Sequence, residues 1–439
     1  FEDRQGNLWI ASFQAGISIY INHPQLFRYY RISADQQSDY QSSIVCSILP
    51  FDEENNKIWV GTDGGGLKLF DRNQNTYKTY LPAENKPGSF PDKVVMTMYK
   101  DKTDTYWFGT YQGGLVKYRE EGDNFRIYQS DPNDSTSISS DFVTSILEDS
   151  EGNFWVGTNG GGLNLFNRKT GVFHAYLNDL NNPNSLIDNY INDIIEDHAG
   201  DLWIATFWGL SRFDTEQQKF TNYLSNKEKS ASLSHNSVFC LLEDSKNRLW
   251  IGTRNGLNLF MQSKGTFVYF TERDGLAGNI IYCILEDEEG FLWISTNRGL
   301  SKFDPESRKF TNFTESDGLQ ANEFFRNSGY KAENNELFFG GINGFNSFFP
   351  DDIRARSYKP PLIITSFKIF DREVPIGAKY DNRRILETSI NNTQSLDLKY
   401  SDKVFSFHLA AIDFVTPEDI VYAYLLEGFD EDWNYTNAK

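Results

Sequence analysis

EDSEGNFWVGTNGGGLNLF, residues 148–166, combines an acidic pair, a tight turn, a tryptophan strand and a glycine-rich turn. Variants of this stretch recur along the chain, each centred on an aromatic residue in the tryptophan slot. The eight anchors are Trp9, Trp59, Trp107, Trp155, Trp203, Trp250, Trp293 and Phe338, at spacings of 50, 48, 48, 48, 47, 43 and 45 residues. Such regularity indicates a repeat protein.

A single repeat, residues 141–177, predicts four strands. The segments FVTSILED, FWVGT, LNLFN and VFHAYL are apolar or alternating, and the turns DSEGN, NGGG and RKTG separate them. Four antiparallel strands form one blade, which can bury its faces only against neighbouring blades. We therefore expect an all-β fold, a β-propeller in which each tryptophan wedges one blade against the next. No helix of useful length is predicted.

The anchors from Trp59 to Phe338 predict seven four-stranded blades. The last copy lacks a fourth strand, and FRYYRI (residues 27–32) reads as an outer strand without a blade of its own. Because a ring must close, we expect residues 27–32 to complete the last blade. An eight-bladed ring that includes the Trp9 repeat is the alternative.

Three segments are predicted. Residues 1–22 read as the truncated end of a preceding propeller, residues 27–355 as the seven-bladed propeller, and residues 360–439 as a small β-sandwich, incomplete at its C-terminus. The proline pair Pro360–Pro361 marks the second boundary. Because the chain begins inside a repeat, we interpret it as part of a larger protein.

The charge pattern bears on partners. The chain of 439 residues carries a net charge of −19 and shows no basic stripe, so we expect no nucleic-acid partner. No run approaches the roughly 18 apolar residues that would span a bilayer. The three cysteines form neither a disulfide framework nor a zinc spacing. Cys240 and Cys283 lie ten residues before an anchor, in a slot of mostly small residues that also holds Asp193.

The repeats resemble the two-component regulator propeller repeat, roughly D-x-x-G-N-L-W-I-G-T-x-x-G-G-L, over about residues 1–350. The tail, YAYLLEGFDEDWNYTNAK, resembles the triple-tyrosine domain that follows such propellers, through Tyr422, Tyr424, Gly428, Trp433 and Tyr435. Together they are similar to the sensor region of hybrid two-component system histidine kinases. That resemblance implies a periplasmic location, oligosaccharide ligands, and a downstream membrane helix and kinase that this chain lacks.

Catalytic or metal-binding residues are not predicted. The histidines are scattered, with no pair at metal-ligand spacing: His23, His174, His198, His235 and His408. Asp149, Asp197, Asp244 and Asp287 recur at one repeat position, so we interpret them as structural. We expect no cofactor and no metal, and no enzyme activity from this chain.

Positions that break the repeat are the candidates for ligand binding. The turns after the Gly-Thr slot vary most, and together they should surround one mouth of the ring. They offer aromatic surfaces for sugar rings and polar groups for hydroxyls. Arg254 and Arg298 would favour an acidic sugar. The candidate ligand-binding residues are Asp63, Tyr111, Phe207, Trp208, Arg254, Arg298 and Asn343.

Three functions compete at this stage. The first is ligand sensing, with an oligosaccharide from polysaccharide breakdown as ligand and a conformational signal to a downstream kinase. The second is a protein-interaction or dimerisation scaffold without a small ligand of its own. The third, an enzyme such as a propeller lyase, would need an acid/base or metal set on the ring mouth, where the sequence offers Asp63 but no histidine. A homodimer is expected under the sensor reading.

Overall fold

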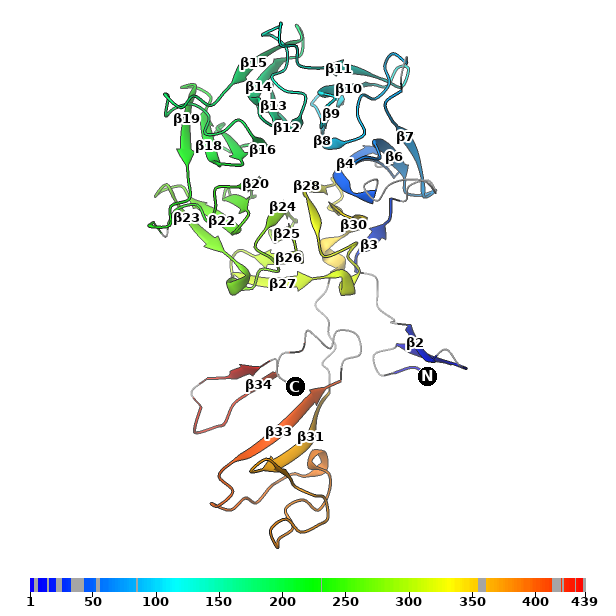
Figure 1. The fold of residues 1–439 in the computed structure, drawn as a ribbon, viewed down its shortest axis with the longest axis vertical. Helices are drawn as coiled ribbons and strands as arrows, with labels where there is room; N and C mark the ends of the chain where they lie inside the picture. Colours follow the sequence, from blue (N-terminus) through cyan, green and yellow to red (C-terminus); the bar gives the residue numbers. More distant parts are fainter. Residues whose placement is uncertain are drawn as a thin grey trace. The chain divides into compact units, whose positions relative to one another are not determined.

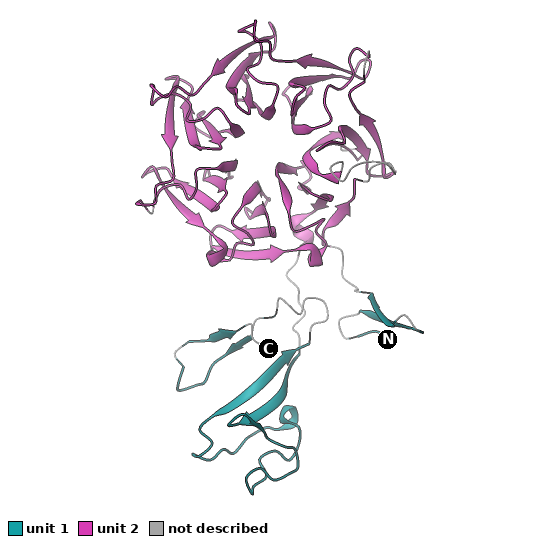
Figure 2. Ribbon diagram, in the orientation of Figure 1, with its two compact units in different colours: residues 1–24, 354–439 teal, residues 25–353 magenta. Residues whose placement is uncertain are grey.

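The computed structural model describes residues 1–3, 7–13, 16–20, 26–32, 43–52, 56–83, 86–229, 231–353, 361–412, 420, 422–430 and 432–436. His23 and Pro360 lie outside the described residues. Two compact units are distinguished: one comprises residues 25–353, and the other comprises residues 1–24 and 354–439 (Figure 2).

The unit 25–353 is a ring of seven four-stranded antiparallel sheets (Figure 1). The first four blades are β4 Val45–Asp52, β5 Lys57–Thr62, β6 Leu67–Asp71, β7 Thr76–Tyr80; β8 Val95–Lys100, β9 Tyr106–Thr110, β10 Leu115–Arg119, β11 Asn124–Tyr128; β12 Val143–Glu148, β13 Phe154–Thr158, β14 Gly162–Asn167, β15 Val172–Tyr176; and β16 Ile191–Glu196, β17 Leu202–Thr206, β18 Gly209–Asp214, β19 Lys219–Tyr223.

The remaining blades are β20 Val238–Glu243, β21 Leu249–Thr253, β22 Gly256–Met261, β23 Thr266–Phe270; β24 Ile281–Glu286, β25 Leu292–Thr296, β26 Gly299–Asp304, β27 Lys309–Phe313; and β28 Phe324–Lys331, β29 Leu337–Gly341, β30 Gly344–Phe348 with β3 Arg28–Tyr30. Among the described residues the helical elements are short 3₁₀ turns, η2 Glu272–Asp274, η3 Glu315–Asp317, η4 Pro350–Asp352 and η5 Ile390–Asn392. The predicted all-β propeller fold is confirmed.

The tryptophan anchors pack blade against blade, as predicted. Trp203 of β17 lies in one buried cluster with Leu249, Ile251 and Phe260 of the following blade. The same arrangement recurs around the ring. Phe338 packs against the first blade in a cluster that includes Val60, so the ring closes through the same kind of contact. Burial of these large rings is the main force that joins the blades.

The recurrent aspartates hold the anchors in place. Asp149 accepts the backbone N–H of Asn153 through Oδ1 at 2.8 Å, and the Trp155 indole N–H through Oδ2 at 2.8 Å. Equivalent indole contacts of 2.7–2.8 Å join Asp101 to Trp107, Asp197 to Trp203, Asp244 to Trp250, and Asp287 to Trp293. The structural interpretation of this recurring carboxylate is therefore confirmed.

Ring closure depends on the segment that precedes the first blade. β3 pairs antiparallel with β30, with Arg28 opposite Ser347 and Tyr30 opposite Phe345. Residues 27–32 thus supply the outer strand of the seventh blade, as predicted, and the Trp9 repeat is not part of this ring. At the same junction Arg72, which follows β6, contacts Glu336 of the seventh blade at 2.5 Å.

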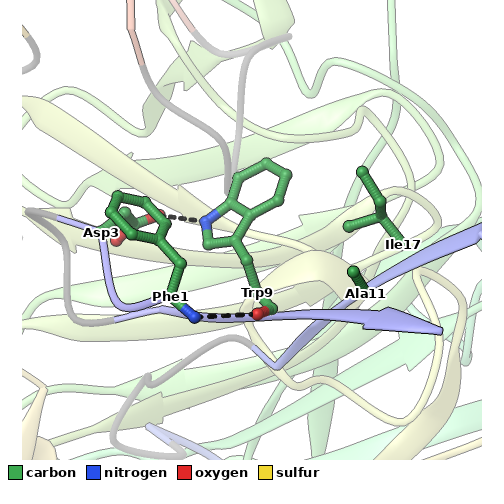
Figure 3. A pocket seen from close by; sticks show the side chains of 5 residues that line it. All are labelled: Phe1, Asp3, Trp9, Ala11 and Ile17. Atoms are coloured by element: carbon green, nitrogen blue, oxygen red, sulfur yellow. Dashed lines mark hydrogen bonds between the residues drawn. The ribbon is translucent and has the colours of Figure 1, made fainter.

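The Trp9 hairpin, described by itself, consists of β1 Leu8–Ser12 and β2 Gly16–Tyr20. The Trp9 indole N–H donates to Asp3 Oδ2 at 2.8 Å, as in the blades of the ring. Phe1, Asp3, Trp9, Ala11 and Ile17 line an open depression of about 500 Å³ beside this pair (Figure 3). That this hairpin ends a preceding propeller stays a prediction.

The tail contains a three-stranded sheet, with β31 Leu362–Ile369 between β32 Arg372–Glu373 and β33 Phe405–Ala411, and a hairpin of β34 Tyr422–Tyr424 and β35 Asn434–Thr436. The sandwich prediction treated residues 383–414 as strands; β33 lies within this stretch, but residues 383–404 form turns, isolated bridges and η5. Apolar residues of this stretch, including Leu386, pack into one buried cluster with Phe367 and Ile369 of β31. The triple-tyrosine assignment stays a prediction.

Candidate functional site

The turn after each second strand has a fixed local geometry. The Thr206 hydroxyl donates to the Gly209 carbonyl at 2.8 Å, and Thr253 and Thr296 make the same contact in their turns at 2.9 Å. Gly256 adopts a φ of +107°, where a Cβ would lie 2.4 Å from the Phe270 carbonyl oxygen. Only glycine fits there, so the repeat fixes the turn backbone and leaves its tip residues free to vary.

The three aromatic candidates lie at two of these tips, Tyr111 at one and Phe207 with Trp208 at the other. Tyr111 is exposed, and its ring lies edge-on to Phe142 at 4.6 Å between centroids. Phe207 is half-buried, and its N–H donates to the Tyr190 carbonyl. Trp208 is 63% exposed, whereas the repeat anchor Trp203 is 2% exposed. Trp208 is thus presented to solvent and takes no part in blade packing.

The polar candidates differ in how they are engaged. Asp63 is half-buried, and burial raises the pKa of its carboxyl. Arg254 is exposed at its turn tip, while Arg298 contacts Glu272 at 3.3 Å. The Asn343 backbone N–H donates to Gln320 Oε1 at 2.8 Å. In the described part of the chain no hydrogen bond, ion pair or ring contact joins any two of the seven candidates.

A second set of variable positions lies on the innermost strands, which surround the axis of the ring (Figure 1). The second residue of each inner strand falls at a register shift, for example between Val238 and Cys240. In the first six blades these residues are Cys46, Met96, Thr144, Asn192, Phe239 and Tyr282. A bulged residue is released from the ladder, so its side chain can be re-aimed.

The seventh blade has a larger irregularity at the same place. The β28–β29 register jumps from Phe324 to Gly329, and the intervening residues include Arg326. The Arg326 guanidinium lies 5.3 Å from the ring centroids of both Phe207 and Phe239. Phe207 is therefore the candidate that the structure joins to a larger cluster.

Tyr282 lies beside this cluster. Its ring centroid is 6.5 Å from that of Phe239, and its hydroxyl donates to Glu323 Oε1 at 3.3 Å. Burial raises the pKa of Tyr282, and Glu323 raises it further, while Arg326 and Arg254 lower it. The phenol is neutral at physiological pH and within the electrostatic influence of two arginines.

Our sequence reasoning missed Phe239, Tyr282 and Arg326. A signal was available for the first two, because each lies eleven residues before an anchor, at a position that holds Thr144 or Asn192 in other blades. Arg326 was harder to find, since its place depends on a wide bulge that the repeat does not contain. The bulge is recognised only from strand register.

Asp193 occupies the small-residue slot of the fourth blade. Its Oδ2 accepts the Leu241 N–H and its Oδ1 accepts the Ile194 N–H, both at 2.9 Å. Burial nevertheless raises the pKa of this carboxyl to about 7. Cys240 fills the same slot in the fifth blade, and a Cβ on Gly252 would lie only 2.3 Å from its Sγ. The slot therefore packs directly against the glycine of the second strand, which explains why the slot holds mostly small residues.

Among the described residues, no three histidine, cysteine, aspartate or glutamate side chains lie close enough together to hold a metal ion. Within the same residues, no helix is long and apolar enough to cross a membrane.

The family comparison matches four of the repeats. Residues 137–160, 185–208, 232–255 and 275–298 match the two-component regulator propeller model. The chain therefore carries two-component regulator propeller repeats, as the sequence resemblance indicated.

Solved structures similar to this chain include an extracellular domain of a two-component system. The chain is similar to the extracellular domain of a protein assigned as the hybrid two-component system BT3049 of B. thetaiotaomicron, with 27% identity and a TM-score of 0.75 over 100% of this chain and 56% of that one. A curated relative, histidine kinase P4 of Formosa agariphila, is 37% identical over 117 residues, which are 27% of this chain and 8% of that protein.

The chain thus spans about half of the solved relative and a small part of the curated one. It is a sensor-like propeller region of the kind found in extracellular domains of hybrid two-component systems. Virginiamycin B lyase of Staphylococcus aureus is also similar, with 14% identity and a TM-score of 0.51 over 70% of this chain and 94% of the lyase. At that identity the likeness shows the fold alone.

Proposed function

We propose that this chain is the periplasmic ligand-sensing region of a hybrid two-component system histidine kinase, and that it recognises an oligosaccharide released by polysaccharide breakdown. The observation that carries the proposal is Trp208, a 63% exposed indole at a turn tip of a two-component regulator propeller. Aromatic faces of this kind stack on sugar rings. Because the Trp208 indole is exposed, it can stack on a sugar ring without giving up contacts in the core.

Signalling would follow from differential binding. An oligosaccharide shifts an equilibrium only if it binds one arrangement of the protein better than another. We propose that the sensor works as a homodimer and that the ligand favours the arrangement that changes kinase activity in the full protein. The membrane would be reached only through a downstream helix.

A thermal-shift screen tests the ligand class. Fragments of plant, host and microbial polysaccharides are added to this chain at millimolar concentration. A ligand at about 100 times its Kd should stabilise the folded state by about 2.7 kcal/mol. Trp208→Ala should abolish the shift caused by a hit. Tyr269→Ala, which removes an exposed aromatic from the outer strand β23, is the matched control and should preserve the shift.

The scaffold function is the alternative. If no oligosaccharide in the panel shifts the melting temperature, and Trp208→Ala leaves signalling by the full protein intact, the sensing site proposed here is refuted. A dimer measured by sedimentation in the absence of any ligand would then favour the scaffold.

A further inference from the structure

Arg326 is held on the axis side of the ring by its own bulge. Asn327, the next residue, adopts a φ of +52°, and its side-chain amide donates to the Asn192 carbonyl at 2.8 Å. That hydrogen bond joins the seventh blade to the fourth, 135 residues earlier in the chain. The bulge is therefore anchored on both sides of Arg326, by strand β28 and by the fourth blade, and the guanidinium is positioned in advance.

Two aromatic rings face the guanidinium. Phe207 comes from the turn after β17 and Phe239 from the bulge of β20, each with its ring centroid 5.3 Å from the Arg326 Cζ. Aromatic rings attract the cation through their faces but accept no N–H hydrogen bonds of carboxylate strength. The edge of the guanidinium, which carries its five N–H donors, stays available for a planar anion.

Among the residues that the structure describes, no carboxylate neutralises the charge of Arg326. In the described part of the chain, no hydrogen bond or ion pair engages its guanidinium. Burial lowers the pKa of Arg326, and the groups that act against this are Tyr282 and Cys46, which are both neutral at physiological pH.

Other partly buried arginines of the ring behave differently. Arg72, Arg168 and Arg212 each contact a carboxylate, and those contacts raise the pKa of the guanidinium against the effect of burial. A half-buried cation without a counter-ion is costly, and folding alone does not require it. Its retention points to an anion supplied from outside.

We propose that Arg326, walled by Phe207 and Phe239, forms the binding site for an anionic group, a carboxylate or sulfate, of the oligosaccharide. This inference rests on the proposed sensing function and names the substrate class as acidic glycans. A carboxylate or sulfate can accept two parallel N–H bonds from the fork of the guanidinium. Trp208, the residue after Phe207 in the chain, offers an exposed stacking face for the sugar ring, and Arg254 adds positive potential near Tyr282.

The test compares Arg326→Met with Arg126→Met. Methionine keeps most of the apolar stem of arginine and removes the charge, and Arg126 is an exposed arginine on the outer strand β11, outside the candidate site. The probes are trigalacturonate, its neutral methyl ester, a sulfated neocarrabiose and neutral maltotriose, titrated by calorimetry. We expect wild-type protein to bind trigalacturonate or the sulfated probe. Arg326→Met should weaken that binding by about 10- to 100-fold, as loss of a charged hydrogen-bonded pair does. Arg126→Met should stay within about 2-fold.

A ligand-free measurement separates a binding role from a structural one. Because the guanidinium is uncompensated, Arg326→Met should keep or raise the melting temperature of the free protein. A fall of several degrees would overturn the inference, since the cation would then be part of the fold.

The remaining outcomes separate the two proposals. Equal affinity for trigalacturonate and its methyl ester, or affinity unchanged by Arg326→Met, overturns the anion site and leaves oligosaccharide sensing standing. Binding of neutral fragments without any binding of acidic ones likewise overturns the anion site and leaves oligosaccharide sensing standing. Failure of every fragment, acidic and neutral, refutes both proposals.

Discussion

Arg72→Met tests how the propeller ring is closed. The Arg72 guanidinium donates to both carboxylate oxygens of Glu336, at 2.9 and 2.5 Å, and to the Tyr30 hydroxyl at 2.9 Å. The side chains of Arg72 and Glu336 are 6% and 5% exposed. One cluster therefore joins the first blade, the seventh blade and the outer strand β3.

The expected magnitude follows from the partner left behind. In Arg72→Met the Glu336 carboxylate keeps the Ser347 hydroxyl at 2.6 Å but loses its cation. Removing one member of a buried ion pair costs about 3–5 kcal/mol. Replacing both members with methionine removes the uncompensated charge, so the double variant should be less destabilised than Arg72→Met alone. It should lie within about 1.5 kcal/mol of the wild type.

Urea denaturation followed by tryptophan fluorescence measures these differences. Arg168→Met is the control, because Arg168 contacts Asp101 at 3.0 Å and Glu148 between two blades inside the ring, and its side chain is 25% exposed. We expect a smaller loss there, about 1–2 kcal/mol. A loss below about 1 kcal/mol for Arg72→Met, or a double variant as unstable as the sum of the single variants, would refute this account of closure.

Three further predictions concern stability. First, the raised pKa of Asp193 means that the folded state retains a proton that the unfolded state releases near pH 4, so the free energy of unfolding should fall as pH rises from about 4 to about 7. A pKa difference of about three units corresponds to a loss of at most about 4 kcal/mol in the free energy of unfolding. Because Asp193 keeps some accessible surface, we expect a loss of about 2 kcal/mol. In Asp193→Asn the melting temperature should therefore depend less on pH in this range. An unchanged slope would contradict the assignment. Second, Trp293→Phe should cost about 1–2 kcal/mol more than Trp59→Phe, because the Trp293 N–H bonds to Asp287, whereas the Trp59 N–H is buried without a partner among the described residues; equal urea midpoints would contradict this. Third, Gly256→Ala should lower the free energy of unfolding by at least about 2 kcal/mol. Gly265→Asn should be tolerated, because the φ of Gly265 is +62° and no atom lies within 4 Å of a Cβ there. Similar melting temperatures for the two variants would show that the Gly256 turn tolerates a side chain.

The repeat architecture could be read from the sequence because its determinants are local. Asp149 and Trp155 lie six residues apart, so one short stretch carries both the indole and the carboxylate that holds it. The aromatic character of Phe338 was sufficient to count it as a seventh anchor. An unpaired strand at residues 27–32 and a blade that lacks one strand predict each other, because open sheet edges are avoided.

The tail was less predictable. Residues 383–414 were predicted as strands, yet Leu386 contributes to the apolar cluster from an isolated bridge and Ile390 from η5. The apolar residues of this stretch do face a core. Their presence does not indicate whether the backbone that carries them is extended.

Among the candidate site residues, the sequence by itself determined the turn tips. The recurring turn glycines, and the threonine that six of the seven blades share, define where variation is permitted. Which side chains meet across the axis was decided only by the tertiary structure. Arg326 meets Phe207 and Phe239 because a bulge in one blade is anchored to another blade 135 residues away. The Arg72–Glu336 contact likewise spans 264 residues. Periodicity records what each blade repeats, whereas contacts between distant blades depend on strand register and ring closure, which exist only once the chain has folded.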